Sequence, residues 1–564
     1  MGDEKTNCDE SALWRIAKWL LLTLGISLFC MGLCTVFIFP VAVESQIRKV
    51  CIVRAVVSGL VEQEGQGIRS LTENGGKVLK NANLREGTEM YEKWLNPPYK
   101  SKTEIYVYSV KNPDEILNGS KPEVRTIGPY VYSQKMGKEV FAKGNGTIKY
   151  ASFELYTFNA NKSCAECSLQ HKVWIPNIVF QKFVEAASNP SMRAAQAALT
   201  SQTPFLEVSV GDMLFKGYKD PFLDKVCSIP FMSFICEAVL DLPDKIAFLA
   251  DSNNTKADML KVSTGEEDGG ETLGQIETWN GEKYVPDSWW SDEFSTKVNG
   301  TDGSLYKPFI DKSDKLYIFV PGLCRSIYFI FDRDVEYKGV HGYRFIVPSN
   351  LFDWSRPENE AFCYNSGKEF FKKDEDCLPK GLIDISRCRR GEPPIIVSLP
   401  NFLFADNIVK DSVVGLNESS PEHDSIAVTL EPRTGVVLLV EKRYQINIAM
   451  WKGNEITAGI DLSRMRSCIV PVISIFTTVE IDDGSLKLLY DRLLNVEKLV
   501  SAFCITTVLI GSLISGVTVA VMCAKSSRLK RLLEKGQRQL ARVSVAPDQT
   551  EKPFSMNHLN SAVH

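Results

Sequence analysis

The sequence predicts a β-dominated α+β protein whose large central part is held between two terminal transmembrane helices. Two uncharged apolar runs cover residues 19–43 and 499–524, and each exceeds the roughly 20 residues that a helix needs to cross a bilayer. Between them, short segments of alternating or β-branched residues recur, as in half-buried strands, and one region has helical signals. We therefore expect residues 19–43 and 499–524 to span a membrane and residues 44–498 to lie together on one side of it.

Basic residues orient the two spans. Arg15 and Lys18 end the N-terminal segment 1–18, and the tail 525–564 begins with a basic stretch in which Glu534 is the only acid up to residue 542. The cations of this stretch are Lys525, Arg528, Lys530, Arg531, Lys535, Arg538 and Arg542. Lys and Arg beside a span mark its cytosolic side, so both termini are predicted in the cytosol. The first run is longer than a signal-peptide core and ends in Phe39-Pro40 instead of a small-x-small site, which favours a retained anchor over a cleaved signal.

The tail and the thiols beside the spans leave alternatives open. Leu529, Leu532, Leu533 and Leu540 fall near one helical face among the cations. That pattern suits a helix on an anionic inner leaflet, and it suits a solvated stop-transfer tail equally well. Cys8 and Cys523 are candidate acylation sites, with unmodified thiols as the alternative.

Glycosylation signals agree with this topology, because every Asn-x-Ser/Thr sequon lies between the two spans. The predicted glycosylation sites are Asn118, Asn145, Asn161, Asn253, Asn299 and Asn417. We therefore interpret residues 44–498 as a glycosylated extracellular or lumenal ectodomain.

The fifteen cysteines also fit an oxidising compartment. Those between the spans are Cys51, Cys164, Cys167, Cys227, Cys236, Cys324, Cys363, Cys377, Cys388 and Cys468. Their even number predicts a disulfide framework. Cys164-x-x-Cys167 could be a redox pair or half of a zinc site, but no second Cys-x-x-Cys or paired histidines accompany it, so a structural disulfide is the default. Cys227 and Cys236 are also close enough in sequence to pair locally.

The ectodomain has no Pro/Gly/Ser-rich linker and no repeat, which favours one large domain. The expected strands are 103–110, 315–320, 327–331, 343–347, 395–399, 425–431, 435–450 and 469–481. Helices are expected at 176–187, 190–199 and 203–216, because Pro190 and Pro204 suit first helical turns.

This helical apex, at about residues 175–216, is the candidate ligand site. Its apolar side chains are helical core in the first interpretation and an exposed binding surface in the second. In the second case, the apolar groups would hold the body of an amphipathic ligand and the cations its acidic head. The candidate residues are Phe180, Lys182, Phe183, Met192 and Arg193.

Catalytic and cofactor motifs are missing from the sequence. The five histidines form no His-Glu-x-x-His motif, and neither a Gly-x-Ser-x-Gly elbow nor a phosphate-binding Gly-x-x-x-x-Gly-Lys loop occurs. The net charge of −4 does not favour nucleic-acid binding. We predict neither an enzyme nor a cofactor or metal site.

A series of short motifs runs along the ectodomain. It includes Cys324-Arg-Ser-Ile-Tyr328, Gly342-Tyr-Arg-Phe345 and Glu431-Pro-x-Thr-Gly435. Others are Trp94-x-x-Pro-Pro98, Asn112-Pro-Asp-Glu-Ile-Leu117, Gly217-Tyr-Lys-Asp-Pro221, Trp289-Trp290 and Asn299-Gly-Thr-Asp-Gly303. Each is weak alone, but in this order between two terminal spans they resemble the class B scavenger receptor family, which includes the platelet fatty-acid translocase and the lysosomal integral membrane protein.

The resemblance implies an irregular antiparallel β-barrel core with a helical apex and an internal lipid tunnel that leads toward the membrane. It also implies the disulfide Cys324–Cys388 with Cys363–Cys377 nested inside, which would leave Cys51 and Cys468 as a further pair.

Three functions are compatible with these expectations. The first is a plasma-membrane scavenger receptor that binds fatty acids, sterols or lipoproteins and transfers them through the tunnel. The second is a lysosomal or endosomal sorting receptor that binds a lumenal protein through the apical helices. The third is an adhesion glycoprotein without a lipid path.

Overall fold

The computed structural model contains two compact units. The first comprises Met1–Gln46 with Asp491–His564, and the second is Ile47–Tyr490. The structure describes residues 16–34, 37 and 84–543, apart from 226, 231–232, 235, 237–239, 244, 269, 374–376, 455 and 457–459. Residues 1–15 of the predicted N-terminal segment, most of the end of the first predicted span and the chain after 543 therefore lie outside the described residues.

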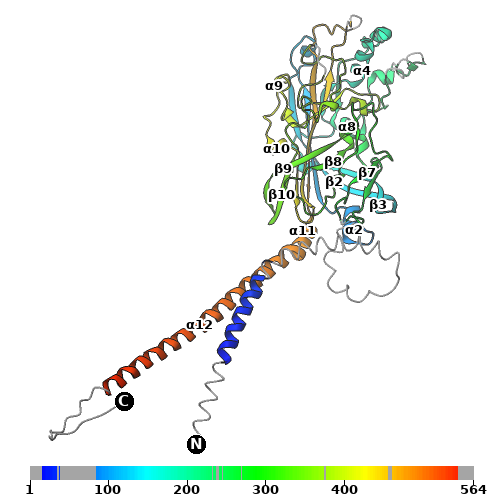
Figure 1. The fold of residues 1–564 in the computed structure, drawn as a ribbon. Coiled ribbons are helices and arrows are strands. Elements are labelled where there is room, and N and C mark those ends of the chain that lie inside the picture. The colour runs from blue at the N-terminus through cyan, green and yellow to red at the C-terminus, as the bar shows by residue number, and fades with distance from the viewer. Residues whose placement is uncertain are drawn as a thin grey trace, which may run out of the picture. The chain divides into compact units, whose positions relative to one another are not determined.

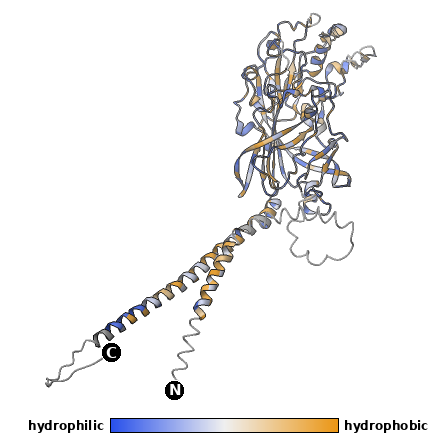
Figure 2. Cartoon of the chain, in the orientation of Figure 1, coloured by the Kyte–Doolittle hydropathy of each residue, from blue (hydrophilic) through white to orange (hydrophobic). Residues whose placement is uncertain are grey.

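The first unit contains the two helices that are long and apolar enough to cross a membrane, Ile16–Cys34 and Lys498–Gln539 within α12 (Asn495–Val543). Both are coloured largely hydrophobic in Figure 2, and α12 becomes hydrophilic toward its C-terminal end. The two helices approach each other closely at a glycine. A Cβ atom added to Gly25 would lie 2.9 Å from the backbone nitrogen of Ser515. The arrangement fits a two-span membrane protein, in which small residues let helix backbones meet.

The second unit is the ectodomain, and it is built on one 13-stranded sheet (Figure 1). The main path runs β7-β6-β3-β2-β1-β15-β14-β13-β10-β9-β8, β12 also pairs with β14, and β11 pairs with β12. Every pairing between these strands is antiparallel.

The strands of the first half are β1 (Lys100–Val110), β2 (Val124–Gly144), β3 (Thr147–Phe158), β6 (Leu260–Ser263), β7 (Ile276–Trp279) and β8 (Leu316–Val320). Those of the second half are β9 (Arg325–Tyr337), β10 (Val340–Ile346), β11 (Ile383–Asp384), β12 (Ile395–Ser398), β13 (Ala427–Glu431), β14 (Val436–Met450) and β15 (Cys468–Glu480). All eight strand segments expected from the sequence lie within or overlap β1, β8, β9, β10, β12, β13, β14 and β15. The long β2 and β3 were not expected.

The two ends of the sheet are brought together by one short segment, which makes it a nearly closed barrel. The Ile276 N–H of β7 donates to the Gly300 carbonyl over 2.8 Å, and the Thr301 N–H donates to the Tyr317 carbonyl of β8 over 3.0 Å. Closing the sheet in this way satisfies edge groups that would otherwise be unpaired. Gly300 has φ +93°, and a Cβ there would lie 2.1 Å from the Tyr317 carbonyl oxygen, so only glycine fits this position.

A buried polar row crosses four central strands. The Tyr108 hydroxyl bonds to Ser474 Oγ over 2.9 Å, and Ser474 donates to Gln445 Oε1 over 3.0 Å. Gln445 donates to Asn447 Oδ1 over 2.8 Å, and Asn447 donates to Ser398 Oγ over 3.1 Å. Because an unmatched polar group in this core would be costly, the row helps to fix the register of β1, β15, β14 and β12.

The helical apex lies at the end of the ectodomain opposite α11 (Asp483–Leu489) and α2 (Glu89–Leu95) (Figure 1). Its principal helix is α4 (Ile178–Ala187), capped by the Asn177 side chain, which accepts from the Phe180 N–H. The second expected helix is split into a 3-10 helix, Pro190–Ala195, and α5 (Gln196–Leu199), with a kink at Met192.

The third expected apical helix is wrong. Its first part is strand β5 (Phe205–Ser209), paired with β4 (Lys172–Pro176), and its last part is a π-helical turn, Asp212–Lys216. The apolar-polar alternation Leu206-Glu207-Val208 fits a strand with one buried face, and the pairing with β4 overrides the helix-start signal of Pro204.

Candidate functional site

The apical residues predicted to bind ligand do not form an exposed surface. Phe180 and Phe183 are fully buried, and the Phe183 ring packs edge-on against Phe222 at 5.0 Å between centroids. Lys182 is buried and Met192 is half-buried, while the side chain of Arg193 lies outside the described residues. The helical-core interpretation is therefore correct for the two phenylalanines, because both rings belong to the buried hydrophobic core.

The polar side of α4 instead supports the loop that follows β14 and the loop between β10 and β11. Gln181 Oε1 accepts from the Trp451 N–H over 2.9 Å, and Ser188 Oγ accepts from the Asn454 N–H over 2.9 Å. Glu185 forms an ion pair with Lys368 at 2.8 Å. Burial by itself would raise the pKa of the Glu185 carboxyl, but the charges of Lys368 and Lys182 outweigh burial and lower it. Helix α4 is thus a platform for neighbouring loops.

These loops line a groove with a cavity volume of about 1060 Å³, which we call the basic groove. Its walls are the turn before β2, the loop closed by Cys363–Cys377, the region of α9 (Asn407–Lys410) and the loop between β14 and β15. Apolar lining residues are Phe370, Phe371, Ile408, Trp451 and Met465. The volume lies at the upper end of the range of small-molecule sites, roughly 300–1,000 Å³.

Cations dominate the polar part of the basic groove. Its basic residues are Lys121, Lys372, Lys373, Lys452, Arg464 and Arg466, and its acidic ones are Glu369 and Asp411. All six cations are exposed, and none forms an ion pair with a described carboxylate, whereas the nearby Lys368 is paired. Four further acids close in sequence, Asp374, Glu375, Asp376 and Glu455, lie outside the described residues. A cleft with an excess of one sign of charge concentrates ions of the opposite sign.

Sequence reasoning missed this site. The sequence does contain two pairs of neighbouring cations, Lys372-Lys373 and Arg464 with Arg466, which could have indicated an anion site. The two pairs lie about ninety residues apart in the chain, so the sequence did not place them together. Only the antiparallel pairing of Met450 with Cys468 and the disulfide-closed loop bring them to one groove.

The disulfides in the structure are Cys164–Cys167, Cys227–Cys236, Cys324–Cys388 and Cys363–Cys377. These are the local and nested pairs expected from the sequence. Cys363–Cys377 closes the loop that carries Phe370, Phe371, Lys372 and Lys373, so it restricts one wall of the basic groove.

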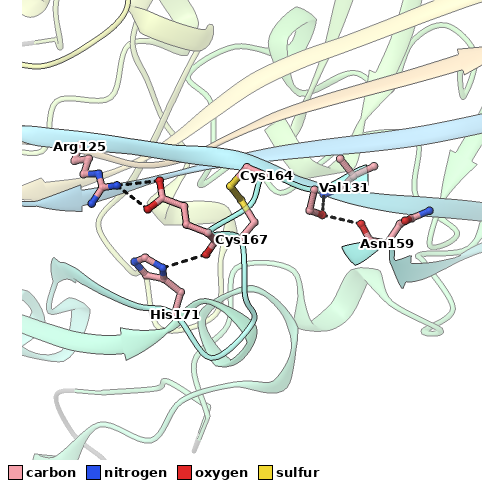
Figure 3. The surroundings of a disulfide bond; sticks show 8 residues. Arg125, Val131, Asn159, Cys164, Cys167 and His171 are labelled. Atoms are coloured by element: carbon pink, nitrogen blue, oxygen red, sulfur yellow. Dashed lines mark hydrogen bonds and ion pairs between the residues drawn. A yellow bond between two sulfur atoms is a disulfide. The ribbon is translucent and has the colours of Figure 1, made fainter. Parts of the chain in front are cut away.

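The surroundings of Cys164–Cys167 are those of a pinned surface loop (Figure 3). Arg125 contacts both carboxylate oxygens of Glu166, at 2.9 and 2.7 Å, and Glu166 lies between the two cysteines. Ser163 Oγ accepts from the Val131 N–H over 2.9 Å. The disulfide therefore sits in a loop tied to β2 on both sides, as a structural crosslink does.

Cys468 differs from expectation. It is buried at the start of β15, beside the basic groove, and carries a free thiol. The expected Cys51–Cys468 pair stays a prediction, because Cys51 lies outside the described residues. The two cysteines were expected to form a disulfide because both were expected to lie near the membrane. In the sheet, however, Cys468 of β15 lies opposite Met450 of β14, at the apical end of these strands.

Burial raises the pKa of the Cys468 thiol to about 12. At about pH 8 only roughly one molecule in ten thousand would carry the reactive thiolate. We expect iodoacetamide to modify Cys468 only after denaturation, without any reductant, as measured by peptide mass spectrometry. Modification that requires prior reduction would show that Cys468 is in a disulfide.

Comparison with known proteins decides the family. The sequence model of the CD36 family matches residues 71–522, which is most of the chain and includes the whole sheet. The chain belongs to the CD36 family. Members of this family therefore provide the context for the basic groove.

CD36-family relatives extend over much of the chain. It is 30% identical to lysosome membrane protein 2 of Rattus norvegicus over 410 residues, covering 72% of this chain and 80% of that protein. It is 28% identical to scavenger receptor class B member 1 of Cricetulus griseus over 380 residues, covering 66% of this chain and 70% of the relative. An uncharacterized protein of Caenorhabditis elegans is 28% identical over 570 residues, covering 89% of this chain and 95% of its own length.

The predicted modification sites of this CD36-family chain remain predictions. Asn118, Asn145, Asn161 and Asn417 are exposed, while Asn253 and Asn299 are half-buried. Cys523 is exposed on α12, and Cys8 lies outside the described residues.

Proposed function

We propose that this protein is a plasma-membrane receptor that captures amphipathic lipids with an acidic head, such as fatty acids or the surface lipids of lipoprotein particles, in the basic groove. The observation that supports this most directly is the set of six exposed cations without described ion pairs, placed beside Phe370, Phe371 and Ile408. Family membership and the relative named as a scavenger receptor support the receptor role.

The basic groove can contact both the acyl chain and the acidic head group of such a ligand. An acyl chain gains roughly 0.8 kcal/mol for each CH₂ removed from water, and the half-buried rings of Phe370 and Phe371 together with Ile408 provide apolar contact. The head group gains from cations that form no ion pair with a described carboxylate. Because these cations are exposed, each contact is worth only about 0.2–1 kcal/mol and weakens with salt.

Transfer of the captured lipid toward the membrane is the second part of the proposal. The tunnel implied by the resemblance remains a prediction, and its presence would give the acyl chain an enclosed apolar path. Lipids extracted from the purified full-length protein and identified by mass spectrometry would test this part.

The lipid proposal is tested by binding of a fluorescent fatty acid, with its methyl ester as an uncharged probe, to the full-length protein in nanodiscs. In the variant Arg464→Glu with Arg466→Glu, two attractive contacts become repulsive, a change of about 2 kcal/mol in total. We expect fatty-acid affinity to fall roughly tenfold or more, and ester affinity to change much less.

A matched control has the same change in net charge elsewhere. Lys225 and Lys283 are exposed and lack described ion pairs, so Lys225→Glu with Lys283→Glu should leave fatty-acid affinity unchanged. Equal affinities of wild type and the groove variant for the acid would refute the groove as the capture site. Equal losses in both variants would show a general charge effect.

Placement at the cell surface rests on the tail. The two-span architecture fits both a plasma membrane and a lysosomal membrane. Leu532-Leu533 follows Lys530 and Arg531 instead of acidic residues, unlike an acid-rich lysosomal dileucine signal. Surface biotinylation of cells expressing the full chain should therefore label most of the protein.

A further inference from the structure

The cytosolic end of α12 presents leucines to solvent. The helix continues without interruption from the apolar span to Val543. Leu529, Leu532 and Leu533 are 61%, 66% and 62% exposed. At 100° per residue, these three side chains lie within an arc of about 100°, so they form one apolar face.

Cations occupy the rest of this segment. Arg528, Lys530 and Lys535 flank the leucine face, at roughly 90–110° from its centre, while Arg531 and Arg538 lie on the opposite side, at roughly 150–170°. All five are exposed and none has an ion pair among the described residues. Glu534 is the only acid between residues 526 and 543.

The exposed leucine face and the surrounding cations together indicate which partner this segment binds. A second copy of the helix could cover the leucines, but it would bring two strongly basic segments together and their charges would repel. Bulk water satisfies the cations but leaves the leucines exposed. An anionic lipid surface satisfies both, because the leucines enter the acyl boundary and the cations meet acidic head groups.

The helix has a place where it can change direction. Ser526 and Ser527 separate the apolar span from the basic segment, and Ser527 Oγ donates back to the Cys523 carbonyl over 2.9 Å. Such a bond from a serine to the carbonyl four residues earlier weakens and bends helices. A bend here would let the segment after it lie along the membrane surface.

We infer that residues 528–543 form a surface-bound amphipathic helix that docks on the anionic inner leaflet. The docking partner is a bilayer that contains acidic phospholipid. This interaction is independent of ligand capture in the ectodomain.

The test uses full-length protein in nanodiscs of phosphatidylcholine alone or with about 30% phosphatidylserine, where the tail is accessible to protease. Trypsin cleavage after Arg531, Lys535 and Arg538 is followed by mass spectrometry. We expect phosphatidylserine to slow cleavage roughly tenfold, since several cations approach the surface together. Leu532→Gln with Leu533→Gln, which keeps helix propensity and charge, should abolish this protection.

The control Gln537→Ala changes a polar side chain outside the leucine face and should retain protection. Equal cleavage rates in both lipids would overturn the inference. Protection that persists in the leucine variant would also overturn it, because charge attraction alone would then explain the effect.

Discussion

Replacing Gly300 with Ala is expected to prevent the ectodomain from folding stably. The new Cβ would lie 2.1 Å from the carbonyl oxygen and 2.2 Å from the carbonyl carbon of Tyr317, which are backbone atoms of β8. The φ of +93° adds strain that costs about 1–3 kcal/mol. Moving the segment away would break its hydrogen bonds to Ile276, Tyr317 and Phe319, at about 0.5–1.5 kcal/mol each. The sum of about 2.5–7.5 kcal/mol is comparable with the whole stability of many domains.

The measurement is the fraction of protein that reaches the cell surface, together with thermal unfolding of the solubilised chain. The substitution keeps the sequon as Asn-Ala-Thr, so loss of a glycan on Asn299 does not confound it. Gly281→Ala is the matched control, because Gly281 has φ +95° but no atom within 4 Å of a built Cβ. Similar losses in the two variants would mean that backbone strain alone acts and that barrel closure at Gly300 is unimportant.

Phe183→Ala is expected to destabilise the ectodomain by about 3–5 kcal/mol, the usual cost of removing a buried aromatic ring. Phe183 is fully buried on α4 and contacts Phe222. Because α4 also supports Trp451, Asn454 and Lys368, the basic groove should be disturbed together with the core. Lower thermal stability and reduced surface delivery are the expected readouts.

Phe234→Ala is the control, since Phe234 is 73% exposed and truncation there should change stability by less than about 0.5 kcal/mol. A Phe183→Ala protein with wild-type stability but weak ligand uptake per surface molecule would contradict this account. It would indicate that Phe183 acts in ligand uptake and contributes little to the stability of the core.

Strands with strong patterns of their own could be predicted from the sequence. β1, β14 and β15 have alternating or continuous apolar residues because their faces are buried by neighbouring strands. β2 was missed, since its second half is mostly exposed and rich in Lys and Glu. That half is a strand because it pairs with β3 from Tyr132 to Gly144, which is a non-local cause that no short window contains.

The burial of the apical phenylalanines could not be predicted for a related reason. The apolar residues of α4 were visible in the sequence, but whether Phe180 and Phe183 face solvent or core depends on what packs against them. Conversely, Lys121, Lys372 and Arg464 look like ordinary surface cations one at a time. They are candidate ligand-binding residues because they line one groove. Sheet pairing and a disulfide bring segments more than three hundred residues apart together there.

The sequence by itself determined the two terminal spans and the local disulfides of this protein, and it predicts the orientation of the spans. Each of these depends on composition within a short stretch: an apolar run long enough for a bilayer, cations at its cytosolic end, and cysteines a few residues apart. Tertiary structure decided the burial of the apical phenylalanines, the free thiol of Cys468, the closure of the barrel at Gly300 and the position of the basic groove. These depend on contacts between distant segments, whose geometry is set only when the whole sheet has paired.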